Sequence, residues 1–190
     1  MENSYLESAT KQFVYYKSLG EKAIAQMAEE DLFKMYNPDS NSVAIIVKHL
    51  WGNMLSRWTD FLTSDGEKDW REREAEFEND LQTRKNLLQK WEEGWQVLFE
   101  ALKPLQAEDL ERIVYIRNQG HTVVEAINRQ LAHYAYHVGQ IVFLAKLMAT
   151  DGWQSLSIPR GESGSFNQKK FSQAKEKKHF TDEFVDPREG

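Results

Sequence analysis

Cysteine is absent from this chain of 190 residues. Without cysteine the chain cannot form disulfides, iron–sulfur clusters, cysteine-ligated zinc sites or a cysteine nucleophile. Any thiol that takes part in its chemistry must therefore be supplied by another molecule.

Long apolar runs are also lacking, since no stretch of about 18 apolar residues occurs. The N-terminal segment mixes polar and aromatic residues, and it lacks the basic start and the apolar stretch of a signal peptide. We therefore expect no membrane span and a cytoplasmic location.

Several nucleotide-binding and hydrolase motifs are missing as well. The sequence contains no Walker loop, no G-x-G-x-x-G and no G-x-S-x-G pattern. Its formal net charge is −6, which argues against nucleic acid as a partner because nonspecific binding relies on a basic surface. This charge says little about small anionic substrates, which respond to local fields.

The sequence does contain four long segments in which apolar residues recur at three- and four-residue spacing. Each pattern predicts an amphipathic helix, over residues 3–29, 42–63, 78–102 and 122–149. Ser42 is a suitable N-cap for the second helix, and Thr122 with Glu125 forms a capping box for the fourth. We therefore predict an all-α protein, a four-helix bundle over residues 1–150, with up-down-up-down as the simplest topology and crossovers possible.

The remaining segments lack helical periodicity. Residues 63–77 are dense in charge and predict a long ordered loop or a loop with a short helix. Residues 112–122 suit either a short extended pair or an irregular crossing. We expect residues 151–190 to form an irregular C-terminal tail, partly packed on the body around Trp153 to Phe166 and mobile over the last twenty residues.

Three of the five histidines lie within predicted helices rather than loops. His133 and His137 are four residues apart, so they project from one side of the fourth helix and can share a metal ion. His49 lies in the second helix, on the flank of the apolar stripe, as the other two do in theirs. Neutral imidazole is the commonest metal ligand in proteins. The main functional hypothesis is therefore a three-histidine metal site with an open position.

The competing interpretation is that these histidines are ordinary packed or surface residues. The residue after His133 is Tyr134 rather than glutamate, so His133 and His137 do not form the H-E-x-x-H motif of zinc proteases. Tyr134 continues the apolar stripe of its helix and is expected in the core. His121 lies more than three turns from the pair and His179 lies in the tail, so neither is expected as a ligand.

The segment K-H-L-W-G-N, which contains His49, and the later H-Y-A-Y-H-V-G-Q-I together resemble the DinB/YfiT-like superfamily, over about residues 5–150. Members of that superfamily are four-helix bundles with a three-histidine metal site, one ligand on the second helix and two on the fourth. The segments D-F-L-T-S-D-G-E-K, W-R-E-R-E-A-E-F and S-I-P-R-G-E-S-G-S-F-N further resemble one branch without an assigned function. The resemblance implies His49, His133 and His137 as metal ligands and zinc or nickel as the metal.

Characterised members of the superfamily include transferases that use mycothiol or bacillithiol and a mycothiol-dependent maleylpyruvate isomerase, and others carry a hydrolase label. The resemblance therefore implies a metal-dependent transferase or hydrolase, acting on a small-molecule substrate with a low-molecular-weight thiol as cosubstrate. The alternative is a non-enzymatic stress-response or interaction module in which the metal is structural. A homodimer is also expected, because aromatic residues along an exposed helix seam would allow one.

Other polar residues are candidates for substrate contacts. Asn53 lies one turn after the histidine of the second helix, where it either contacts a ligand or hydrogen-bonds within the bundle. Arg71 and Arg73, together with Glu67, either clamp an anion or form a solvated surface network. Gln140, in the fourth helix, is expected to serve packing or to face solvent. We retain Asn53, Arg71 and Arg73 as candidate substrate-binding residues.

Overall fold

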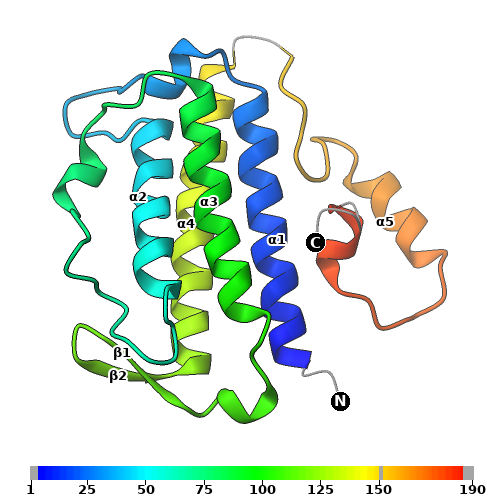
Figure 1. Ribbon diagram of the computed structural model, residues 1–190. Coiled ribbons are helices and arrows are strands. Elements are labelled where there is room, and N and C mark those ends of the chain that lie inside the picture. The colour runs from blue at the N-terminus through cyan, green and yellow to red at the C-terminus, as the bar shows by residue number, and fades with distance from the viewer. Residues whose placement is uncertain (1–3, 150–151, 186–190) are drawn as a thin grey trace.

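Figure 1 shows the computed structural model of the chain, which describes residues 4–149 and 152–185. These residues are mostly helical, which confirms the expected class, and they include one small two-stranded sheet. The α-helices among them are α1 (Ser4–Ala25), α2 (Val43–Trp58), α3 (Arg84–Leu102), α4 (Val123–Met148) and α5 (Ser163–Phe171). The strands are β1 (Ile113–Ile116) and β2 (Gln119–Thr122), and short 3-10 helices are η1 (Glu30–Phe33), η2 (Glu74–Phe77), η3 (Ala107–Asp109) and η4 (Phe180–Glu183).

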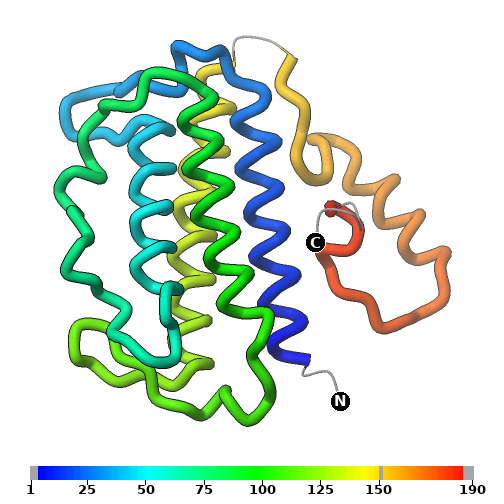
Figure 2. Tube along the Cα trace, viewed as in Figure 1, coloured from blue at the N-terminus to red at the C-terminus, as the bar shows by residue number. Residues whose placement is uncertain are grey.

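Helices α1 to α4 lie side by side, as Figures 1 and 2 show. Helix α2 packs against α3 and α4, and α1 packs against α4 and α3. The colour gradient shows α1 and α4 running in one direction and α2 and α3 running in the other. The simplest topology expected from the sequence, up-down-up-down, is therefore wrong, and a long crossover joins the parallel helices α2 and α3.

The crossover occupies residues 59–83 and returns along the length of α2 (Figure 2). Helix α2 ends at Trp58 rather than near residue 63, and Asp60 turns the chain with a left-handed conformation (φ 50°). The crossover contains the 3-10 helix η2, which packs against α2. The expectation of an ordered loop with a short helix is confirmed, and this loop extends to Thr83, the N-cap of α3.

The N-terminal ends of the two histidine-bearing helices have the expected caps. The Ser42 hydroxyl accepts a hydrogen bond from the backbone N–H of Ile45 at 3.2 Å. The Thr122 hydroxyl accepts from the N–H of Glu125 at 3.1 Å, and the Glu125 carboxylate accepts from the N–H of Thr122 at 2.8 Å. Each cap satisfies backbone donors that a helix cannot pair internally, so the starting points of α2 and α4 are well defined.

Strands β1 and β2 form an antiparallel hairpin directly before α4, so the expected extended pair is confirmed. Its turn residues, Arg117 and Asn118, have φ values of 55° and 60°, as a tight hairpin turn requires. The Asp65 carboxylate accepts from the backbone N–H groups of both turn residues, each at 2.8 Å. The turn is thereby attached to the crossover, although the two are some fifty residues apart in the chain.

Aromatic side chains from all four long helices meet in the core. Phe13, Trp58, Trp95 and Tyr134 are buried. The Phe13 ring lies 6.2 Å from Trp58, 6.3 Å from Trp95 and 5.9 Å from Tyr134, centroid to centroid, in edge-on or tilted contacts. Such pairs stabilise a core beyond the area that they bury. The expectation that Tyr134 belongs to the core is confirmed.

The C-terminal tail is more regular than expected. The prediction of an irregular tail is wrong over Ser163–Phe171, which forms helix α5. Trp153 and Leu156 pack against the core, in agreement with the expected packed part. Helix η4 lies against α1, where the Tyr15 and Phe180 rings are 5.6 Å apart. The last part of the segment expected to be mobile, residues 186–190, lies outside the described residues.

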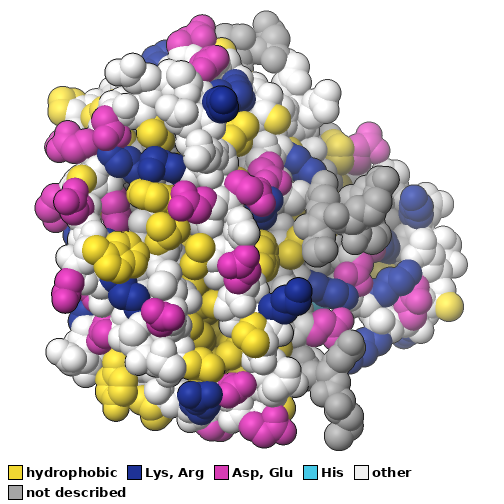
Figure 3. Space-filling view, viewed as in Figure 1, with side chains coloured by type: hydrophobic (Ala, Val, Ile, Leu, Met, Phe, Trp, Pro, Cys, Tyr) yellow, Lys and Arg dark blue, Asp and Glu magenta, His cyan; other side chains and the backbone are white. Residues whose placement is uncertain are grey.

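The molecular surface carries mixed charge. On the face shown in Figure 3, acidic and basic side chains are interspersed rather than separated by sign. None of the helices in residues 4–149 and 152–185 combines the length and apolar character that crossing a membrane would require.

Helix α1 contacts α3 at Gly20, where an added Cβ atom would lie 2.5 Å from the ring of Trp91. We predict that Gly20→Ala lowers the free energy of unfolding by about 1–3 kcal/mol, because the indole must shift within a packed core. Urea denaturation followed by circular dichroism measures this change.

The matched control is Gly139→Ala on α4, where no described atom lies within 4 Å of the added Cβ. This substitution should leave stability unchanged or raise it by about 0.5–1 kcal/mol, because alanine favours helix over glycine. Equal destabilisation by both variants would show that the close contact at Gly20 is not the cause.

Candidate metal centre

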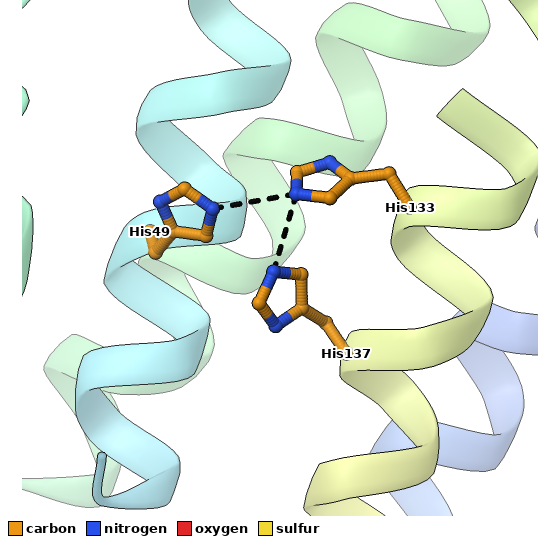
Figure 4. Close-up of side chains that lie close together, drawn as sticks. All are labelled: His49, His133 and His137. Carbon is orange, nitrogen blue, oxygen red and sulfur yellow. Dashed lines mark hydrogen bonds between the residues drawn. The ribbon is translucent and has the colours of Figure 1, made fainter. Parts of the chain in front are cut away.

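The structure brings the three helical histidines together. Figure 4 shows His49 on α2 facing His133 and His137 on α4. The Nε2 atom of His133 lies 3.4 Å from Nε2 of His49 and 3.2 Å from Nε2 of His137. One ligand atom from each histidine lies within 4.8 Å of the other two, so the cluster could hold a metal ion.

Neighbouring side chains determine which ring nitrogens carry protons. Nδ1 of His49 lies 2.8 Å from the Glu76 carboxylate, which can only accept while it is ionised. Nδ1 of His137 lies 2.9 Å from Oε1 of Gln140, which is also an acceptor. In their neutral forms, His49 and His137 therefore each carry the proton on Nδ1. The Nε2 atom of each ring then presents a lone pair to Nε2 of His133.

This arrangement of lone pairs fits a cation. A single N–H on Nε2 of His133 cannot point at both lone pairs at once, whereas a metal ion accepts all three nitrogens. Zinc bound tetrahedrally at about 2.0–2.1 Å places neighbouring nitrogens roughly 3.3 Å apart. The separations of 3.4 and 3.2 Å around His133 match that spacing. The residues present therefore fit a divalent metal held by imidazole.

Burial keeps the imidazoles of His133 and His137 in the form that binds metal. His49 and His137 are buried, and His133 is partly buried. Desolvation, with the nearby His137, His49 and arginine side chains, lowers the pKa of His133 to about 3. Desolvation, with the neighbouring His49, lowers the pKa of His137 to about 4, against a hydrogen bond with Gln140 that acts in the opposite direction. Both rings are therefore neutral near pH 7, as metal binding requires.

Glu76 connects the cluster to a chain of buried charges. Arg71 donates from Nε to one oxygen of Glu76 at 2.7 Å and from Nη2 to the other at 3.0 Å. Burial raises the pKa of the Glu76 carboxyl, but the hydrogen bonds from His49 and Arg71 outweigh this effect and hold that pKa below its usual range. The close approach depends on Gly52, because a Cβ atom at that position would overlap the Glu76 carboxylate.

A cavity of about 320 Å³ adjoins the histidine cluster. All three histidines line it, together with Asn53, Phe77 and several arginines. This volume is at the small end of the range for small-molecule sites. The cluster therefore faces a space in which a small substrate could reach it.

The chain was compared with known protein families, curated proteins and solved structures. The model of a family described as "Protein of unknown function (DUF1572)" matches residues 1–162. The chain belongs to this family. No curated protein matches, and no solved structure matches. The family match includes the whole histidine cluster of this DUF1572 protein, its cavity and the first part of its tail.

The candidate substrate-binding residues of this DUF1572 protein all line the cavity, but they differ in their bonding. Asn53 is buried, and its Oδ1 accepts from the Tyr134 hydroxyl at 3.0 Å. The guanidinium of Arg71 is buried and engaged by Glu76, so it acts first as a support for that carboxylate. Arg73 is half exposed, with its guanidinium 5.6 Å from the centre of the Phe77 ring.

The other histidines lie outside the cluster, as expected. Nε2 of His121 is 3.3 Å from Nη1 of Arg129, and Nε2 of His179 is 3.0 Å from the Ser8 hydroxyl. Gln140 differs from expectation, because its side chain contacts His137 rather than serving only packing or solvent contact.

Sequence reasoning missed Glu76, the buried partner of His49. Glu76 is one of four glutamates at alternate positions in the charged segment, the others being Glu72, Glu74 and Glu78. No helical or strand period in one sequence distinguishes it from the rest. What distinguishes Glu76 is its burial, since it is the one buried residue of its 3-10 helix, and this burial follows from the path of the crossover.

Metal affinity should depend on Glu76 although it is not a ligand. We predict that Glu76→Gln weakens zinc binding about tenfold or more, because the carboxylate orients His49 and raises its basicity. Competition with a chromogenic chelator measures the affinity. Glu74→Gln is the matched control, since Glu74 lies in the same 3-10 helix with its side chain 95% exposed. Equal affinities for the two variants would argue against an orienting role.

The histidine cluster should make the metal-free protein less stable in acid. The folded-state pKa values of His133 (about 3) and His137 (about 4) lie below the ordinary value of 6.5. As pH falls below about 6.5, the unfolded chain therefore binds more protons than the folded protein. The free energy of unfolding decreases as a result, until the folded state is protonated as well.

Urea denaturation in the presence of a chelator, at pH 7 and pH 5, measures this loss. We expect the double variant His133→Asn, His137→Asn to lose less stability over this interval than the unmodified chain. The comparison removes the contribution of the carboxylates, which both proteins share. The same loss in both would show that these imidazoles are not kept neutral by the fold.

Proposed function

We propose that this protein binds one divalent metal ion through His49, His133 and His137 and is a DinB-like four-helix-bundle enzyme. The observation that supports the metal best is the set of Nε2 atoms that converge with their lone pairs inward beside a cavity. Further support comes from the distribution of the histidines, one on α2 and two on α4, which is the distribution that the DinB-like resemblance implies.

Zinc and nickel are the proposed metals. Imidazole nitrogen suits both, whereas magnesium and calcium prefer oxygen ligands. Three neutral imidazoles leave the charge of the ion uncompensated and at least one position free for a further ligand. Such an ion would lower the pKa of a coordinated water or thiol and favour its nucleophilic form at neutral pH.

The proposed reaction is transfer of a low-molecular-weight thiol onto an electrophile, with hydrolysis as the alternative reaction at the same site. The chain contains no cysteine, so the thiol is a cosubstrate. The protein residues have positioning roles here. Glu76 and Gln140 orient the imidazoles of His49 and His137, and Asn53 presents its amide group at the cavity wall.

A second candidate function is a non-enzymatic interaction module in which the metal has a structural role. The packing of the four long helices argues against a need for metal, because their core is continuous and apolar without it. A helical core of this kind folds by burial of its side chains rather than by metal binding.

The proposal is tested first by metal analysis of protein purified without a histidine tag. We expect close to one equivalent of zinc or nickel per chain. His137→Ala should bind metal at least about tenfold more weakly with little change in helical circular dichroism, since the core does not depend on that imidazole. His121→Ala is the matched control and should bind metal normally. Protein that stays free of metal after gentle purification and metal addition would contradict the site.

Turnover separates the two candidate functions. Metal-loaded protein is mixed with a model electrophile and with bacillithiol, glutathione or coenzyme A in turn. We expect a rate above that of the metal-free protein with at least one thiol. Full metal occupancy with no thiol turnover and no hydrolysis would favour the interaction module.

A further inference from the structure

Arginine is concentrated around the cavity beside the histidines. Among the described residues that line it, none is aspartate or glutamate, and five are arginines: Arg57, Arg71, Arg73, Arg117 and Arg129. The chain as a whole has a net charge of −6, so this local excess of positive charge runs against the overall sign. Such a cleft concentrates anions through its local field.

Two of these arginines, Arg57 and Arg71, are buried as well as paired with carboxylates. Arg71 is buried against Glu76, and Arg57 is buried and lies 3.3 Å from Glu67. The same Glu67 oxygen also lies 3.6 Å from Arg71 and 3.0 Å from Arg117. Glu67 and Glu76 together therefore serve three guanidinium groups, so these ion pairs contain one positive charge more than negative charges.

The other three arginines retain donors for a ligand. Arg117 uses Nη2 for Glu67, and Arg129 places Nη1 3.3 Å from His121. Arg73 has its nearest carboxylate at 3.8 Å, on the exposed Glu74. These three come from the hairpin turn, from α4 and from the crossover, so they approach the cavity from separate elements. We call Arg73, Arg117 and Arg129 the rim arginines.

The wall of the cavity also presents two amide side chains, those of Asn53 and Gln130. Trp58 Nε1 donates to the Tyr134 hydroxyl at 3.0 Å, and that hydroxyl donates to Oδ1 of Asn53 at 3.0 Å. This relay occupies Oδ1 of Asn53 and directs its NH₂ group away from Tyr134. Gln130 is 3% exposed and lines the cavity, and its Oε1 has no partner among the described residues. Buried polar groups normally have partners, so the unpartnered oxygen of Gln130 is consistent with a polar ligand.

We propose that the cavity binds a small organic anion, whose carboxylate or phosphate oxygens are held by Arg73, Arg117 and Arg129. Guanidinium groups match both kinds of oxyanion because their N–H donors form a planar fork. The amides of Asn53 and Gln130 contact the remainder of the molecule. This inference rests on the proposed function in one respect, namely that the bound anion is the substrate presented to the histidine cluster.

The test measures binding of two probe anions, inorganic phosphate and succinate, by isothermal titration calorimetry at low ionic strength. Each is titrated into chelator-stripped protein and into zinc-loaded protein, and zinc content is determined on the same samples. The variants are Arg73→Gln, Arg117→Gln and Arg129→Gln. Arg112→Gln is the matched control, because Arg112 is half exposed, pairs with Asp109 and lies outside the cavity.

We expect saturable binding of at least one probe to both forms of the protein. Each rim variant should weaken binding of the probe about fivefold or more. The expected loss of affinity is smaller than for a fully buried charged hydrogen bond, because Arg73 and Arg117 are half exposed. Arg112→Gln should bind normally. The tighter probe identifies the oxyanion class, and this result supports the anion site even if the protein then shows no thiol turnover.

Two results would overturn the inference. Absence of saturable binding by both probes in both forms would exclude an anion site. Binding only to zinc-loaded protein, with an affinity that the rim variants leave unchanged, would assign the anion to the metal instead. The second result would leave the proposed metal function intact, so the two proposals fail separately.

Discussion

The hydrogen bond between His49 and Glu76 determines the character of the histidine cluster. It holds the proton of the His49 imidazole on Nδ1, so that Nε2 faces the other two rings as a lone pair. Arg71 keeps the Glu76 carboxylate ionised and oriented, and Gly52 leaves the space that the carboxylate occupies. The cluster therefore depends on the crossover as much as on the two helices that carry the histidines.

The parallel arrangement of α2 and α3 explains why such a crossover exists. The chain leaves α2 at its C-terminal end, and it must return along that helix before α3 can begin beside the N-terminal end of α2. That return path places Glu67, Arg71 and Glu76 against α2. It also carries Asp65 to the hairpin turn, which brings Arg117 to the cavity. One topological requirement thus supplies most of the charged residues around the site.

The sequence was most informative where local rules apply. Helical spacing placed His133 and His137 on one side of a helix, and the capping patterns at Ser42 and Thr122 located the starts of α2 and α4. It was least informative where long-range contacts decide the structure. Nothing local distinguishes Glu76 from neighbouring glutamates, and helix α5 has too weak a pattern to be separated from a loop.

The contact between the Asp65 carboxylate and the backbone of the hairpin turn has an evolutionary consequence. The turn residues contact that carboxylate through backbone N–H groups, so these two hydrogen bonds do not depend on their side chains. Arg117 can therefore be exchanged for another residue while the core and the three imidazoles stay as they are. Relatives with the same histidines can diverge in the ligands that they select by changes confined to a two-residue loop.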